Sequence, residues 1–234
     1  MLEKRQVLLF SGGMDSMIAA HLHPTALKLY VATGSKYQEK ELAYLKSAYT
    51  ENEIKFDFRL NLHDIEREDA IVPARNLFLT VIASLYGDSV ILCAVNGDGS
   101  TDKDALFASM QTELLQHIFS PPHFTDYKPT VYLPMREKSK GEWVRWYLEN
   151  SGSAEKLMSS VSCYHPHHFY CGRCKACIRK WVAQEINGLV GTPWDQHPSG
   201  YEWDQFIPKI LAREWRCVQE DADTEAVLRR FGVI

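Results

Sequence analysis

The chain has 234 residues, of which 45% are hydrophobic and 24% charged, and its formal net charge is -4. A chain of this size can bury a core of its own, and we expect one main α/β body with a smaller appendage. The slightly acidic balance gives no overall attraction to nucleic acid and favours small-molecule substrates. No apolar run approaches the roughly 20 residues that span a bilayer. We therefore expect a cytoplasmic protein without a signal peptide or membrane partner.

Apolar runs typical of strands alternate with helical patterns through the first 150 residues. The predicted strands cover 7–10, 27–32, 54–60, 90–95 and 130–133, and the predicted helices cover 16–23, 38–51, 73–86, 105–119 and 140–149. This alternation predicts a doubly wound, mainly parallel sheet, in which ligands bind beyond the carboxyl ends of the strands.

The pattern changes after residue 150. Residues 151–177 are rich in turn residues, cysteine and histidine, and we expect helices from 178 onward, over 201–216 and over 223–230. The prediction is therefore an α/β domain over 1–150 and a cysteine-bearing part with C-terminal helices over 151–234.

A glycine-rich turn, Ser11-Gly12-Gly13-Met14-Asp15-Ser16, joins the first predicted strand to the first predicted helix. Its glycines let the backbone approach a bound anion closely, and the first N–H groups and the dipole of the helix attract negative charge. The string resembles the PP-loop of the ATP pyrophosphatases, which split ATP into AMP and pyrophosphate, and differs from a Walker A loop. The resemblance implies that Ser11, Gly12, Gly13, Asp15 and Ser16 hold pyrophosphate and that Asp15 also positions Mg²⁺. The alternative is a turn capped by Ser11 and Asp15 that binds nothing.

Most of the cysteines are gathered in one short segment: Cys163, Cys171, Cys174 and Cys177. Four thiolates with two-residue gaps are typical of a closed, tetrahedral, structural zinc site. Because the segment is too polar for a core of its own, we expect the metal to supply its folding free energy. An alternative is that a histidine of the same segment, at 165, 167 or 168, replaces a cysteine. The other two cysteines, at 93 and 217, are predicted to be small apolar core residues.

The order of the two motifs, with the segments between them, resembles the 7-cyano-7-deazaguanine synthases over about residues 6–183. The segments that carry the resemblance are Lys36-Tyr37-Gln38 with Glu41-Leu42, Val72-Pro73-Ala74-Arg75-Asn76, Asn96 with Asp98, Ser139-Lys140 and Ser162-Cys163-Tyr164. The resemblance implies an enzyme that ligates ammonia to the carboxylate of 7-carboxy-7-deazaguanine and dehydrates the amide to a nitrile. In both stages ATP would activate an oxygen as its AMP ester.

The resemblance also implies roles for polar residues between the motifs. Arg75 and Lys140 are expected to stabilise charge on the phosphates, the alternatives being a surface ion pair and a solvated helix start. Asn76 either caps its helix or faces the purine-like ring. Asn96 and Asp98 follow a predicted strand at the ligand-binding end of the sheet. Asp98 is expected to accept two N–H bonds from a guanine-like edge, unless the segment is a plain turn.

The loop over residues 96–104 departs from the family pattern, because it is shorter and lacks a Tyr-Pro-Asp segment. Asp102 or Asp104 is a candidate for the missing aspartate. The departure leaves open an alternative substrate, a related deazapurine acid that is amidated or conjugated.

Two other classes of function are alternatives. A tRNA-modifying PP-loop enzyme would need a basic surface, which the charge does not favour, and a non-enzymatic zinc-binding module would leave the glycine loop unused. Members of the resembled family often pair. An aromatic C-terminal segment with Trp203, Phe206 and Trp215 could form the interface of a homodimer or could cover the sheet.

Overall fold

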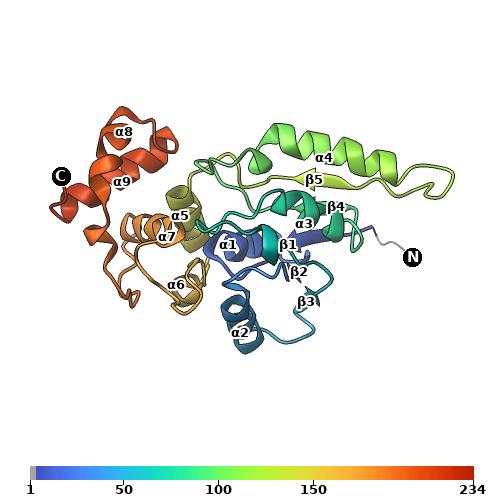
Figure 1. Ribbon diagram of the computed structural model, residues 1–234, viewed down its shortest axis with the longest axis horizontal. Helices are drawn as coiled ribbons and strands as arrows, with labels where there is room; N and C mark the ends of the chain where they lie inside the picture. The colour runs from blue at the N-terminus through green and yellow to red at the C-terminus, as the bar shows by residue number, and fades with distance from the viewer. Residues whose placement is uncertain (1–3) are drawn as a thin grey trace.

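A five-stranded sheet forms the centre of the protein in the computed structural model, which describes residues 4–234 (Figure 1). Its strands are β1 (Gln6–Leu9), β2 (Leu27–Val31), β3 (Ile54–Asp57), β4 (Ser89–Ile91) and β5 (Thr130–Tyr132). They lie in the order β3-β2-β1-β4-β5, and all neighbours are parallel. The predicted parallel sheet is confirmed. Because the strand order reverses beside β1, the turn after β1 lies where such sheets bind ligands.

Helices cover both faces of the sheet, as a doubly wound fold requires. On one face pack α1 (Met14–Leu22), α2 (Gln38–Ala48) and α5 (Lys140–Glu149), and on the other pack α3 (Arg75–Ala83) and α4 (Ala105–Ile118). The strand residues alternate between these layers: Leu8 joins the first core, whereas Val7 and Leu9 join the second. Side chains of a strand point to opposite faces in turn, so one fully apolar run serves both cores.

Local capping fixes where two helices begin. The hydroxyl of Ser139 accepts the N–H of Glu142 at 3.3 Å, while the Glu142 carboxylate accepts the N–H of Ser139 at 2.8 Å. This capping box starts α5 at Lys140, as predicted. Asp104 caps α4 by accepting the N–H of Phe107 at 2.8 Å.

The C-terminal part differs from its prediction in several places. A helix that was not expected, α6 (Ala154–Ser159), begins at a Ser153 cap. Helix α7 (Lys175–Glu185) begins before residue 178, because the Cys174 sulfur caps it by accepting the N–H of Cys177. The predicted helix over 201–216 is broken into a short 3-10 turn and α8 (Ile207–Ala212), and α9 (Val218–Arg230) begins before residue 223. Helix α8 ends at Arg213, which is in the left-handed region with φ 64°.

The C-terminal helices lie together at one end of the molecule (Figure 1). The short 3-10 turns are η1 (His63–Ile65), η2 (Thr101–Lys103), η3 (Pro198–Gly200) and η4 (Trp203–Gln205). Trp203, Phe206 and Trp215 contact one another and pack with α7 in a separate hydrophobic cluster. The expectation that they cover the sheet is therefore wrong. Their part in a dimer stays a prediction.

Within the described residues, no helix combines the length and the apolar character that crossing a membrane requires. The expectation about a signal peptide rests partly on residues 1–3, which lie outside the described range.

Candidate functional site

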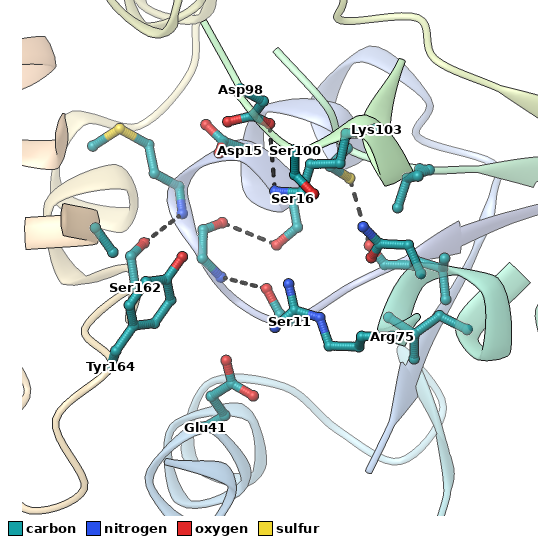
Figure 2. A pocket seen from close by; sticks show the side chains of 18 of the residues that line it. Ser11, Asp15, Ser16, Glu41, Arg75, Asp98, Ser100, Lys103, Ser162 and Tyr164 are labelled. Atoms are coloured by element: carbon teal, nitrogen blue, oxygen red, sulfur yellow. Dashed lines mark hydrogen bonds and ion pairs between the residues drawn. The ribbon is translucent and has the colours of Figure 1, made fainter. Parts of the chain in front are cut away.

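A cavity of about 560 Å³ opens at the carboxyl ends of β1, β2 and β4. Its walls come from the turn after β1, from α2 and α3, from the loop after β4, and from residues 161–164 and the start of α7 (Figure 2). Residues far apart in the chain therefore meet at the end of the sheet where a ligand was expected.

The glycine turn lies at the floor of this cavity. Gly12 has φ +73°, and a Cβ atom there would stand 2.8 Å from the Leu45 side chain, so only glycine fits between the turn and α2. Gly12 itself lies beneath the turn, whereas the other four expected pyrophosphate residues, Ser11, Gly13, Asp15 and Ser16, line the cavity. Gly13 is the N-cap residue of α1.

The start of α1 is available to a ligand. The N-cap residue Gly13 makes no side-chain cap hydrogen bond; of the alternative cap by Ser11 and Asp15, only the Ser11 hydroxyl accepts an N–H of the turn, that of Gly13. The N–H groups of Gly13 and Met14 reach only the hydroxyls of Ser11 and Ser162, at 3.3 Å each, among the described residues. Long hydrogen bonds of this kind are readily exchanged for stronger bonds to an anion. The helix dipole adds to the attraction.

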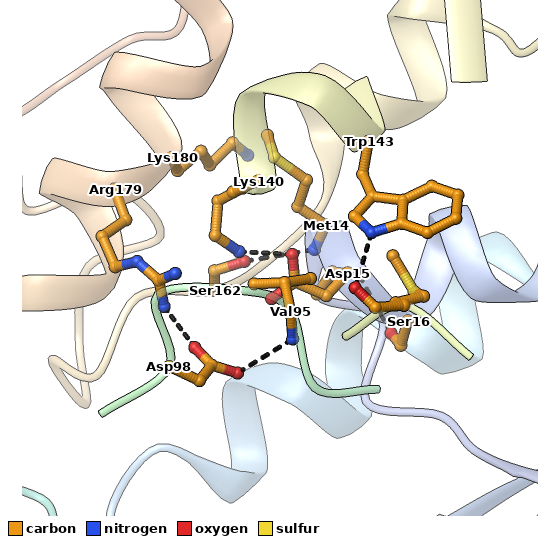
Figure 3. A network of polar contacts seen from close by, with 12 residues as sticks. Met14, Asp15, Ser16, Val95, Asp98, Lys140, Trp143, Ser162, Arg179 and Lys180 are labelled. Atoms are coloured by element: carbon orange, nitrogen blue, oxygen red, sulfur yellow. Dashed lines mark hydrogen bonds and ion pairs between the residues drawn. The ribbon is translucent and has the colours of Figure 1, made fainter. Parts of the chain in front are cut away.

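Three ion pairs involve carboxylates that line the cavity, and Figure 3 shows Lys140 beside Asp15 and Arg179 beside Asp98. Lys140 is buried and its ammonium pairs with Asp15, so the alternative of a solvated helix start is wrong. Asp98 pairs with Arg179 and with Lys103, the latter at 3.5 Å, and its other contact is the N–H of Val95. Burial favours the neutral acid, but the neighbouring Lys103 and Arg179 outweigh it and hold the pKa of Asp98 well below its usual range. Both carboxylates are therefore already engaged by cations.

The residues of the predicted Val-Pro-x-Arg-Asn segment also reach the cavity. Arg75 is half-buried and donates to the Tyr37 hydroxyl at 2.8 Å, and it forms no ion pair with a carboxylate of the described part of the chain. The expected surface ion pair is therefore not present. Asn76 is 2% exposed, lines the cavity, and donates to the Asp102 carbonyl at 3.2 Å. It does not cap α3, whose N-cap residue is Ala74.

Only some polar residues of the loop after β4 line the cavity. Asp98 faces the cavity, but Asn96 does not line it; the Asn96 backbone N–H instead donates to the Lys138 carbonyl at 2.9 Å. Asp102 and Asp104 also lie outside the cavity lining. The Asp102 carbonyl accepts a hydrogen bond from Asn76, and the Asp104 side chain caps α4.

Several residues that the sequence analysis left without a role line the same cavity. They include Tyr30, Glu41, Ser162, Tyr164 and Arg179. Glu41 and Tyr164 stood in segments that carried the family resemblance. Arg179 lies on α7, and no local pattern in the sequence singles it out.

Residues of the C-terminal part contact the loop over residues 96–104, which departs from the family pattern. Arg179 joins Asp98 to Glu220 of α9, with a distance of 2.5 Å to Glu220. A Cβ atom on Gly99 would lie 3.9 Å from the guanidinium of Arg216, which also lines the cavity. This side of the cavity is therefore built jointly by residues 97–103 and by a segment beyond α7.

The four predicted cysteines form one cluster. Their sulfur atoms all lie within 4.8 Å of one another, and Cys171 and Cys177 are 3.9 Å apart. Zn–S bonds of about 2.3 Å in a tetrahedron place sulfurs about 3.8 Å apart, so the donor set fits zinc. Gly172 has φ +72°, and a Cβ there would clash with the Gln196 carbonyl at 1.6 Å, which explains a glycine inside the Cys-x-x-Cys turn.

The neighbouring histidines and cysteines have other positions. None of the three histidines belongs to the cluster, and His168 instead pairs with Asp195 at 2.5 Å. Cys93 and Cys217 also lie apart from it. Cys93 is past the end of β4, where it packs against the first core and also lines the large cavity, so its prediction as an apolar packing residue is confirmed. Cys217 is the half-buried N-cap residue of α9 and belongs to none of the core clusters of the described residues, so its prediction as a core residue is wrong.

Two buried lysines connect the cysteine segment to the cavity. Lys40 of α2 donates to the carbonyls of Cys163 at 2.7 Å, of His168 at 2.8 Å, and of His165. Lys180 of α7 donates to the carbonyls of Met158 and Ser160, just before Ser162. Because Ser162 and Tyr164 line the cavity, the cysteine segment and the cavity wall are one piece of chain held by these ammonium groups.

Comparison with known proteins agrees with this geometry. The model of a family described as "Queuosine biosynthesis protein QueC" matches residues 42–187. A 7-cyano-7-deazaguanine synthase from Sulfolobus acidocaldarius is 27% identical over 80% of this chain and 47% of its own length. Synthases of the same name from Chloroherpeton thalassium and Methanobrevibacter smithii are 26% and 24% identical, over 79% and 77% of this chain and 94% and 92% of theirs. The chain thus spans about half of the first relative and nearly all of the other two.

Proposed function

The chain belongs to the family of the queuosine biosynthesis protein QueC, and on that premise we propose that it is an ATP-dependent carbon–nitrogen ligase. Its substrates would be 7-carboxy-7-deazaguanine and ammonia, and its product 7-cyano-7-deazaguanine, made through adenylated carboxylate and amide intermediates. The observation that carries the proposal is the uncapped start of α1, which faces a cavity with Arg75 and Lys140 in its walls. The family match begins at residue 42, so the nucleotide loop is argued from its own geometry.

The proposed chemistry explains why one cavity suffices. A carboxylate oxygen is a poor leaving group, whereas an AMP ester leaves readily. The same activation of an amide oxygen lets the carbon–nitrogen bond become a nitrile. Both stages need the triphosphate of ATP to be bound in the same way. In both, negative charge grows between the α-phosphorus and pyrophosphate, and the site must stabilise it.

Each predicted residue takes a part in this scheme. Ser11, Gly12, Gly13 and Ser16 would hold pyrophosphate through backbone and hydroxyl groups at the start of α1. Lys140 would turn from Asp15 to the incoming phosphates, because an ammonium that pairs with one carboxylate can pair equally with a phosphate oxygen.

Other cavity residues would act on the phosphates and the acid. Arg75 would contact the α-phosphate, because its guanidinium is held by a neutral hydroxyl and not by a carboxylate. Asn76, Asn96 and Asp98 remain the proposed contacts of the deazapurine, with Asn96 requiring a different side-chain position because it lies outside the cavity lining.

Two metals fit the residues present. Asp15 is the proposed ligand of Mg²⁺, which would neutralise charge on the phosphates. Cys163, Cys171, Cys174 and Cys177 are the proposed ligands of a structural Zn²⁺, because they supply a closed set of four sulfurs that leaves no open position for catalysis.

Incubation of the protein with ATP, Mg²⁺, ammonia and 7-carboxy-7-deazaguanine tests the proposal. Mass spectrometry should show the amide first and the nitrile later, together with AMP and pyrophosphate. ADP in place of AMP would contradict activation through the α-phosphate. A protein that consumes no ATP with this acid would overturn the proposed substrate.

The second candidate is a related deazapurine acid, and a specific observation favours it. Arg179 and Lys103 already neutralise Asp98, which was expected to read the guanine-like edge. Arg216, from beyond the family match, adds a further cation to this side. An acid with an additional anionic group would suit these cations better than 7-carboxy-7-deazaguanine. Competition of such acids in the same assay separates the two candidates.

We also propose a cytoplasmic, homodimeric protein whose residues 1–150 bind the nucleotide and whose residues 151–234 carry the metal. The reducing conditions of the cytoplasm suit a cluster of free thiols.

A further inference from the structure

The carboxylates that line the large cavity are Asp15, Glu41, Asp69 and Asp98. Asp15 and Asp98 pair with buried cations, as described above, and Asp69 pairs with Arg67 at 3.2 Å. Each of these three carboxylates therefore already has a cationic partner.

Glu41 differs from the other three. It is half-buried on α2, and the Tyr30 hydroxyl donates to its Oε2 at 3.0 Å. Among the described residues no cation pairs with it. Figure 2 shows its carboxyl group pointing from α2 toward the space between Tyr164 and Ser11. This acid therefore faces the cavity near the glycine turn without a positive partner among the described residues.

The charged groups nearest to Glu41 are engaged elsewhere. The Lys40 ammonium donates hydrogen bonds to carbonyls of the cysteine segment, and the Arg75 guanidinium donates to the Tyr37 hydroxyl. Burial raises the pKa of Glu41 to about 7. The hydrogen bond from Tyr30 and the attraction of Arg75 and Lys40 lower this pKa, but they do not outweigh burial. Cavity carboxylates whose pKa values are pushed apart in this way divide into charge stabilisers and proton acceptors.

We propose that Glu41 is the catalytic base that takes the proton from the attacking nitrogen. The proposal rests on the proposed function. In the first stage the nitrogen of ammonia bonds to the acyl carbon of the adenylate, and the carbon–oxygen bond breaks with its electron pair leaving on AMP. The proton that the nitrogen loses goes to the Glu41 carboxylate, which returns it to water between turnovers.

The second stage needs the same group. When the amide oxygen carries AMP, the nitrogen gives up two protons, one to water and one to the Glu41 carboxylate, while the carbon–oxygen bond breaks with its electron pair leaving on AMP and the nitrile forms. One base beside one activating loop therefore serves both stages. Tyr30 is a positioning residue, because its hydroxyl fixes the Glu41 carboxyl from the end of β2.

The test separates adenylation from nitrogen transfer in the full-length protein. Substrate-dependent exchange of labelled pyrophosphate into ATP reports the adenylate alone. Glu41→Gln should keep this exchange within about threefold of the parent, while the rate of amide formation falls by at least about 100-fold. With the concentration of unprotonated ammonia held constant across the titration, the amide rate of the parent should rise with pH to a plateau above about pH 7, and this rise should be absent from the variant.

Matched variants complete the test. Glu39→Gln removes the same charge from an exposed position on the same helix and should change neither rate. Tyr30→Phe should keep the rate of pyrophosphate exchange and shift the pH range over which the rate of amide formation rises. The assignment would be overturned if Glu41→Gln lost pyrophosphate exchange and amide formation equally. It would also be overturned if the amide rate of Glu41→Gln rose with pH as that of the parent does.

A direct titration tests the base without turnover. In the protein labelled with ¹³C-glutamate, the carboxyl signal lost in Glu41→Gln should titrate near pH 7, and titration near 4.5 would refute the proposal whatever the substrate is. Absence of exchange in the parent would count against the proposed substrate and leave this titration to decide the role of Glu41.

Discussion

Lys40 offers the sharpest test of how the metal segment is attached to the cavity. The substitution Lys40→Met keeps most of the hydrocarbon length of a side chain that is 6% exposed, but removes its ammonium. The carbonyls of Cys163, His165 and His168 then lose their common donor. These groups lie within or beside the metal-binding segment, so the variant tests that segment directly.

The magnitude follows from the hydrogen bonds lost. A bond to a charged group contributes about 1.5–3 kcal/mol, but removing a buried ammonium also removes its desolvation cost. We therefore take about 1 kcal/mol for each of the three bonds, or about 3 kcal/mol in total. If the segment opens locally, its opening equilibrium should increase roughly 100-fold.

Zinc transfer to a chelator and amide hydrogen exchange over residues 160–170 measure this opening. Both rates should increase by roughly 100-fold in Lys40→Met. Lys46→Met, at an exposed position on the same helix, is the matched control and should behave as the parent does. Equal rates in the two variants would refute the reasoning, because Lys40 would then contribute nothing to holding the segment.

The remaining predictions concern the metal, the nucleotide loop and association. Cys174→Ala should lose bound zinc by mass spectrometry and about 3 kcal/mol of stability, which lowers Tm by roughly 6–12 °C; retained zinc would contradict the ligand set. Asp15→Asn should reduce pyrophosphate exchange at least about 100-fold with an unchanged circular dichroism spectrum, and full exchange would remove Asp15 from the site. Helix α4 exposes a stripe spaced four residues apart, Leu106, Met110, Leu114 and Ile118, each between 43% and 68% exposed. Met110→Glu with Leu114→Glu should convert a dimer into a monomer in light scattering, and an unchanged mass would exclude this face.

The sequence was informative where a local pattern has a single physical solution. Alternation of apolar strands with helical segments leads to a parallel sheet because crossover connections are right-handed and cover both faces. The glycine turn and the four cysteines were readable because their spacing alone fixes the backbone geometry around an anion or a metal. The start of α5 at Lys140 was predictable from its capping residues.

Tertiary structure decided which charges meet. Asp15 and Lys140 are 125 residues apart, and Asp98 and Arg179 are 81 residues apart, so no local pattern reveals either pair. The same holds for Glu41, which stands apart from the other cavity carboxylates because its neighbours Lys40 and Arg75 bond elsewhere. Spacing along the chain indicated the candidate ligand loops, whereas burial and the choice of partner, which exist only in the folded chain, determined which cavity carboxylate has no cationic partner.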